Sequence, residues 1–245
     1  MKLTGRVRVV GGGGLGYGLS SHYDCNVYAL DCGSGGYALI DAGSGIEPEL
    51  LLRRLEEDGI APERVTRLLL THAHADHAGG ARAIRERLGV EVVAAEKTAR
   101  MVELGDEVRT SLAEARASGT YPPWYRLQPC RIDRTVAAGD KITAGDLSLQ
   151  VIAASGHSFD MVCYYCPELK ALFSADAVFA GGKLAVIRTP DFSMDAYRQT
   201  ITGLSKLEVE QLFPGHGYAV TERGGEDVAA AHRRFREGVA PQSIV

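Results

Sequence analysis

Three histidines and an aspartate occupy six consecutive positions in the segment "THAHADHAGG" at residues 71–80. They are His72, His74, Asp76 and His77, in a chain of 245 residues that has only seven histidines. Neutral imidazole nitrogens and carboxylate oxygens are the ligands that Zn²⁺ and similar divalent cations take in proteins. A polar loop that merely follows a strand needs no such set at this spacing, so the segment predicts a metal site.

Further ligands are expected downstream, because four side chains cannot complete two metal coordination spheres. His157 lies in "AASGHSFD", Asp176 in "LFSADAVF" and His216 in "LFPGHGYAV". Each follows a predicted strand in a turn with Gly or Ala, where a side chain can project from the rim of a sheet. The two remaining histidines, His22 and His232, are interpreted as ordinary surface residues.

The elements around the cluster are predicted from turn residues and hydrophobic periodicity. β-prone runs at 6–10, 26–31 and 37–43 predict an antiparallel meander, and the buried run 65–70 leads directly into the histidines. About ten strands and five helices are predicted in all. The helices are expected at 47–59, 81–89, 98–117, 193–207 and 227–238.

Composition narrows the function class. A formal net charge of −4 gives no electrostatic footprint for nucleic acid or an anionic membrane surface, so we expect a small-molecule substrate. The sequence shows no signal-peptide pattern and no long apolar run, and its five cysteines do not predict a disulfide framework. A cytoplasmic location is therefore expected.

On these motifs the chain resembles the metallo-β-lactamase fold superfamily, and within it the glyoxalase II-like metallohydrolases. The matching motifs follow in order between residues 20 and 220: "NVYALD", "ALIDAGSG", "THAHADHAGG", "SGHS", "SAD" and "PGHG". The resemblance implies an α+β fold, a four-layer αββα sandwich. We expect a single domain over residues 1–245, with an inserted helix and loop at about 97–130.

The resemblance also implies a ligand set for two divalent metal ions, zinc first, with iron or manganese as alternatives. It assigns His72, His74 and His157 to the first ion, Asp76, His77 and His216 to the second, and makes Asp176 the bridge. A hydroxide bridging the metals would cleave an ester, thioester or lactone, and Asp76 would orient it and relay its proton. Homodimerisation is left open.

Departures from the family pattern bear on the substrate. Only 29 residues follow His216, whereas glyoxalase II enzymes carry a C-terminal helical domain that grips glutathione. Phe179 stands where lactone-opening relatives often have tyrosine, and Asp176 argues against β-lactamase activity. The alternatives are a mononuclear iron sulfur dioxygenase, a nuclease of the same fold, and an idle binding protein.

Two glycine- and cysteine-based motifs are given structural interpretations. Gly11, Gly13 and Gly16 have the spacing of a dinucleotide-binding loop, but they precede a predicted hairpin and not a helix. A turn or a mobile flap is expected there. Cys163 and Cys166 resemble a redox or zinc motif, yet they lie in a strand-like run, so packing is favoured.

Tyr121, Trp124 and Tyr125 lie in the proline-containing loop 118–130. Their rings are expected to anchor the loop to the core, with a wall of the substrate pocket as the alternative.

Overall fold

The computed structural model describes residues 1–245, with eleven strands and seven α-helices. Its contacts divide the chain into two compact units. Residues 1–137 and 144–146 form the N-terminal unit, and residues 138–143 and 147–245 form the C-terminal unit. The expectation of a single domain stays a prediction.

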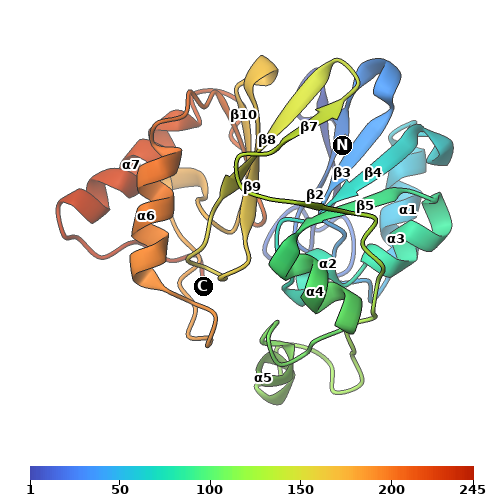
Figure 1. The fold of residues 1–245 in the computed structure, drawn as a ribbon, viewed down its shortest axis with the longest axis horizontal. Coiled ribbons are helices and arrows are strands. Elements are labelled where there is room, and N and C mark those ends of the chain that lie inside the picture. The colour runs from blue at the N-terminus through green and yellow to red at the C-terminus, as the bar shows by residue number, and fades with distance from the viewer. The chain divides into compact units, whose positions relative to one another are not determined.

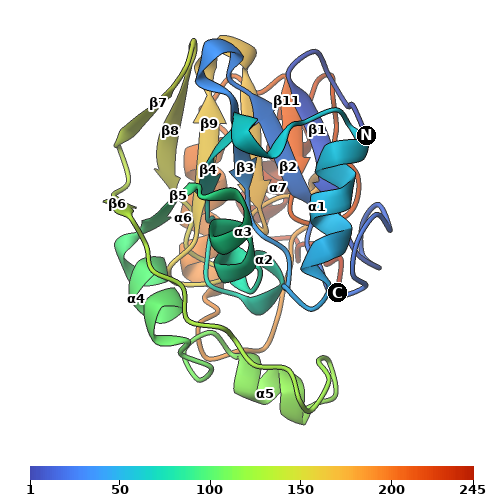
Figure 2. The ribbon, with the colours of Figure 1, turned by 90° about the vertical axis from the view of Figure 1, so that its right-hand side faces the viewer.

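The N-terminal unit contains a six-stranded mixed sheet in the order of the sequence (Figure 2). The first three strands pair antiparallel, which confirms the predicted meander, and the last three add in parallel. The parallel additions require crossover connections, which the helices provide. The strands are β1 (Val7–Gly11), β2 (Val27–Asp31), β3 (Tyr37–Ile40), β4 (Val65–Leu69), β5 (Glu91–Ala95) and β6 (Arg134–Val136).

Five helices belong to this unit: α1 (Pro48–Glu57), α2 (Ala75–Ala78), α3 (Ala81–Leu88), α4 (Glu96–Leu104) and α5 (Leu112–Ala117). α1 and α3 pack against each other and against the sheet (Figure 2). α1 buries Leu51 and Leu55 in the core that the strands share. Gly59 and Gly89 follow α1 and α3 with φ of +72° and +67°, the left-handed conformation that ends many helices.

The single helix predicted over residues 98–117 is wrong, because the structure divides this segment into α4 and α5. Gly105 has a φ of +59° and ends α4. The Asp106 carboxylate then accepts hydrogen bonds from the amides of Val108 (3.2 Å) and Arg109 (2.9 Å), which fixes a turn. As a result Leu104 and Val108 are 69% and 77% exposed, although the apolar periodicity had assigned them to a buried face.

The C-terminal unit contains a five-stranded sheet in the order β11-β10-β9-β8-β7. Its helices α6 (Met194–Leu204) and α7 (Gly225–Arg236) contact each other and cover one face of this sheet (Figure 1). All five residues of β9 and of β10 are buried. The strands are β7 (Lys141–Ala144), β8 (Leu147–Ala153), β9 (Val162–Cys166), β10 (Ala171–Ala175) and β11 (Gln211–Pro214).

Both units thus combine a sheet with covering helices, which confirms the α+β class. None of the helices has the length and apolar character that crossing a membrane would require.

Candidate metal centre

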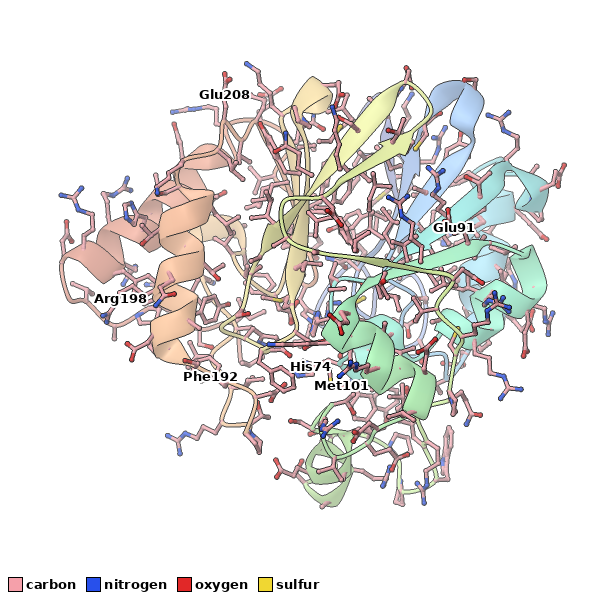
Figure 3. The ribbon with its side chains drawn as sticks, in the orientation of Figure 1. His74, Glu91, Met101, Phe192, Arg198 and Glu208 are labelled. Atoms are coloured by element: carbon pink, nitrogen blue, oxygen red, sulfur yellow. The ribbon has the colours of Figure 1, made fainter.

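The seven predicted ligands fall into two sets, four in the N-terminal unit and three in the C-terminal unit. The first set follows the buried end of β4. His72 and His77 are fully buried, and the ring of His72 lies 4.6 Å from that of His74 and 4.1 Å from that of His77, between centroids. Figure 3 marks His74 in the loop before α2. Asp76 Oδ2 is 3.5 Å from His77 Nε2. The four side chains therefore lie close together after the end of β4.

A buried carboxylate that the sequence analysis did not assign supports this set. Asp41 is 2% exposed and follows β3, the strand parallel to β4, so its side chain lies at the same sheet edge as the histidines. Its Oδ1 accepts a hydrogen bond from the Thr71 amide, and its Oδ2 accepts from the Thr71 hydroxyl and from His77 Nδ1, each at 2.8 Å. Asp41 has a φ of +64°, a conformation that aspartate tolerates better than most residues.

These bonds fix the orientation of two imidazoles. The Thr71 hydroxyl donates its proton to Asp41, so its oxygen accepts from His72 Nδ1 at 3.0 Å. With Nδ1 engaged as a donor in both His72 and His77, Nε2 is the nitrogen left to act as a ligand. The sequence does carry a sign of Asp41, because this acidic residue directly follows a predicted strand in "ALIDAG".

The second set comes from three strand ends of the C-terminal unit. His157 follows β8, Asp176 follows β10 and His216 follows β11, and all three are buried. Nε2 of His157 and Nε2 of His216 each lie 3.4 Å from the same oxygen, Oδ2 of Asp176. The Asp176 carboxylate therefore lies between two imidazoles.

A buried tyrosine on α6 holds the loops of this second set. The Tyr197 hydroxyl donates to the carbonyl of Asp176 and accepts from the amide of Ala185 at 3.1 Å. The carbonyl of Ala185 in turn accepts from His157 Nδ1 at 3.1 Å. His157 is thereby fixed through Nδ1 in the same way as His72 and His77.

The donor chemistry of both sets fits divalent metal ions. Each set offers only imidazole nitrogen and carboxylate oxygen, and three of the five imidazoles are oriented by an acceptor at Nδ1. Cys25 Sγ also lies within 4.8 Å of ligand atoms of Asp41 and His77. Burial raises the pKa of this thiol well above its ordinary value, so it stays protonated and is a poor ligand at neutral pH.

The other motifs have structural roles. Cys163 and Cys166 are buried free thiols of β9, which confirms the packing interpretation. The glycine-rich loop folds back on itself, with the Gly13 amide bonded to the Asp24 carbonyl at 2.9 Å, and it leads into β2 and not into a helix. His22 is exposed, as expected.

Tyr121 and Tyr125 are buried in a satellite core, so these two rings do anchor their loop. Trp124 is different, because it is 66% exposed and the anchoring interpretation is wrong for it.

Comparisons with known proteins identify the family of the chain. Residues 22–216 match the family model of the metallo-beta-lactamase superfamily. The chain is 31% identical to an acyl-coenzyme A thioesterase, MBLAC2, of Gallus gallus, over 73% of this chain and 67% of that protein. It is 29% identical to a hydroxyacylglutathione hydrolase of Rhizobium meliloti, over 76% of this chain and 59% of that protein.

Among solved structures, a metallo-beta-lactamase from Pontibacter korlensis superposes with a TM-score of 0.70 at 22% identity, covering 96% of this chain and 97% of that one. At this identity the likeness shows the fold alone.

The chain belongs to the metallo-beta-lactamase superfamily and has its fold. The two relatives named above are hydrolases of this superfamily, and the chain is a metal-dependent hydrolase like them. The predicted resemblance is thereby confirmed.

Proposed function

We propose that this protein is a dinuclear metal-dependent hydrolase that cleaves a small-molecule thioester. The observation that carries the proposal is the pair of ligand sets, in which five of the seven side chains are buried and three of the five imidazoles are oriented through Nδ1. The thioester is favoured over an ester or lactone because the relatives are named as an acyl-coenzyme A thioesterase and a hydroxyacylglutathione hydrolase.

In this proposal all seven residues serve the same two ions, with zinc as the first candidate. His72, His74 and His157 would hold one ion, Asp76, His77 and His216 the other, and Asp176 would bind both. When bound, such a pair of ions would lower the pKa of a coordinated water towards neutrality and would polarise the substrate carbonyl.

The residues of the chain supply orientation and proton transfer. Asp41 and the Ala185 carbonyl fix imidazole rings, so that the ligand nitrogens are pre-organised before any ion binds. Asp76 has a side chain that is 20% exposed and can therefore also reach a substrate. We assign it the role of accepting the proton of the attacking water and passing it to the leaving sulfur.

A substrate panel tests the proposal. Purified protein loaded with Zn²⁺ is assayed with acyl-coenzyme A and S-acylglutathione thioesters, with lactones and with aryl esters, while its metal content is measured by elemental analysis. We expect about two zinc ions per chain and the highest kcat/KM on a thioester. A single iron per chain with sulfur-oxidising activity would instead establish the dioxygenase, and activity confined to lactones would refute the substrate class.

A further inference from the structure

Residues 242–245, the C-terminal strap, pair with the segment of the C-terminal unit that fixes the imidazole of His157. The Leu184 amide donates to the Gln242 carbonyl at 2.8 Å, and the Ile244 amide donates to the Leu184 carbonyl at 3.0 Å. These two bonds make an isolated parallel β-bridge. The strap therefore binds the main chain one residue before Ala185, whose carbonyl accepts from His157.

The segment 184–186 is bonded from two sides. The amides of Leu184 and Val186 donate to the strap, at 2.8 Å to a carbonyl and at 3.1 Å to a serine hydroxyl. Between them, the Ala185 carbonyl accepts from His157 Nδ1 at 3.1 Å. In an extended chain the main-chain groups of successive residues point to opposite edges. The strap and the histidine therefore hold the same segment at opposite edges.

Helix α7 anchors both partners of this bridge. After the end of α7 the Val239 amide donates to the Arg234 carbonyl at 2.9 Å, which turns the chain back before the strap begins. On the other partner, the Gly181 amide donates to Asp227 Oδ1 of α7 at 2.8 Å. The strap and the segment that it pairs with are thus fixed to the same helix.

The strap contributes hydrogen bonds but little buried apolar surface. Gln242, Ser243 and Val245 are exposed, the last at 62%, and Ile244 is half-buried. Leu184, by contrast, is fully buried and belongs to the main core of the C-terminal unit. Since apolar burial supplies most of the stability of a fold, we expect the unit to fold without the strap.

We propose that the C-terminal strap is a positioning element for His157, which holds the Ala185 carbonyl where it accepts from Nδ1 and so orients Nε2 towards a metal ion. The proposal rests on the proposed function, which makes His157 a metal ligand. Without the strap, the amides of Leu184 and Val186 bond to water, and Ala185 is held only through its own bond to Tyr197. The imidazole then gains rotational freedom, and a group that orients a ligating histidine is worth about 10- to 100-fold in metal affinity.

The test compares two truncations of the full chain. One removes residues 242–245, and the matched control removes only Val245, whose amide donates within the strap to Ser243 Oγ at 3.3 Å. Zinc affinity is measured by competition with a chromophoric chelator. We expect the protein without the strap to bind one of its two zinc ions about 10-fold more weakly, and the control to bind both as the wild type does.

Two point variants accompany the truncations. Ile244→Pro keeps the length of the chain and removes the donor to the Leu184 carbonyl, so it should weaken zinc binding even if the truncated protein fails to fold. Tyr165→Phe controls for a general loss of stability, because it removes a 2.6 Å bond to the Glu208 carbonyl and bonds to no predicted ligand. It should lower the urea midpoint and leave zinc affinity unchanged.

A measurement on the imidazole itself separates positioning from destabilisation. In the metal-free protein, ¹⁵N-edited NMR follows the exchange of the His157 Nδ1 proton with water, and comparison with His157→Gln assigns the signal. The bond to the Ala185 carbonyl protects this proton, so loss of the strap should raise its exchange rate about 10-fold, whereas Tyr165→Phe should not change it. Wild-type exchange in both the truncated protein and Ile244→Pro would overturn the proposal. Faster exchange with unchanged zinc affinity would also overturn it, because other contacts would then orient Nε2.

Neither the exchange rate nor the zinc affinity depends on the substrate. Faster exchange and weaker zinc binding without the strap, in a protein that hydrolyses no thioester, would support positioning and refute the proposed function. An active wild type whose truncated form keeps wild-type exchange and zinc affinity would refute positioning alone.

Discussion

Replacing Asp41 by asparagine tests how far the site is organised in advance of metal binding. Asparagine is nearly the same size as aspartate and also tolerates the left-handed backbone, which Asp41 adopts at a φ of +64°. The change therefore keeps the shape and the backbone conformation, removes the charge, and replaces one acceptor oxygen by a donor NH₂ group.

The structure sets the magnitude of the effect. The two oxygens of Asp41 accept three hydrogen bonds, two of them at Oδ2. If the amide oxygen takes the Oδ2 position, the NH₂ group faces the Thr71 amide, and at least one buried donor is left unsatisfied. Such a group costs about 1–3 kcal/mol of the free energy of unfolding, which for a chain of this size lowers the melting temperature by about 2–12 °C. Because His77 loses a charged partner, zinc affinity should fall about 10- to 100-fold.

Thermal unfolding of the metal-free protein and zinc titration against a chelator measure the two effects separately. Asp24→Asn is the matched control, because Asp24 is also buried and accepts bonds from Ser44 N (2.7 Å) and Ser44 Oγ (2.6 Å), but from no predicted ligand. The control should lose stability and keep its zinc affinity. If Asp41→Asn binds zinc as the wild type does, the argument that the carboxylate pre-orients the imidazoles is refuted.

Three further predictions concern Asp76, Tyr197 and the buried thiols. Asp76→Asn should keep some metal but lose most of its turnover; near wild-type turnover would remove Asp76 from the proton transfer. Tyr197→Phe should cost about 1–3 kcal/mol for each of the two main-chain groups it leaves buried, seen in urea unfolding, and it should weaken zinc binding; an unchanged urea midpoint would contradict this. Burial raises the pKa of buried thiols, so their protonated form stabilises the fold below the ordinary value of about 8.5, and this contribution is lost as pH rises towards the raised value. The pKa is raised to about 11 for Cys32, about 11 for Cys130 and about 12 for Cys166. Iodoacetamide should therefore label the native protein slowly at pH 8, faster near pH 11, and fully in urea. Rapid labelling of the native protein at pH 8 would contradict the burial of these thiols.

The ligands could be predicted from the sequence because they lie in short motifs of unusual composition that directly follow predicted strands. A run such as "VTRLLL" must be buried, so the polar residues that follow it must lie at a sheet rim. The same reasoning placed His157, Asp176 and His216, which the structure brings together at the ends of β8, β10 and β11.

The groups that support the ligands could not be found in this way, because each acts through a contact distant in sequence. Asp41 lies 36 positions from His77, and Tyr197 bonds to the main chain of residues 176 and 185. Apolar periodicity also failed for residues 98–117, where Gly105 and the Asp106 turn outweigh helix propensity. The short strand β6 and the four-residue helix α2 gave too few positions for any period to show.

The most direct test of the central claim is an anomalous diffraction measurement at the zinc edge on crystals of the metal-loaded protein. The account predicts two peaks, one within bonding distance of His72, His74 and His157, and one within bonding distance of Asp76, His77 and His216, with Asp176 contacting both. A single peak, or two peaks that lack His157 or His216 as neighbours, would contradict it.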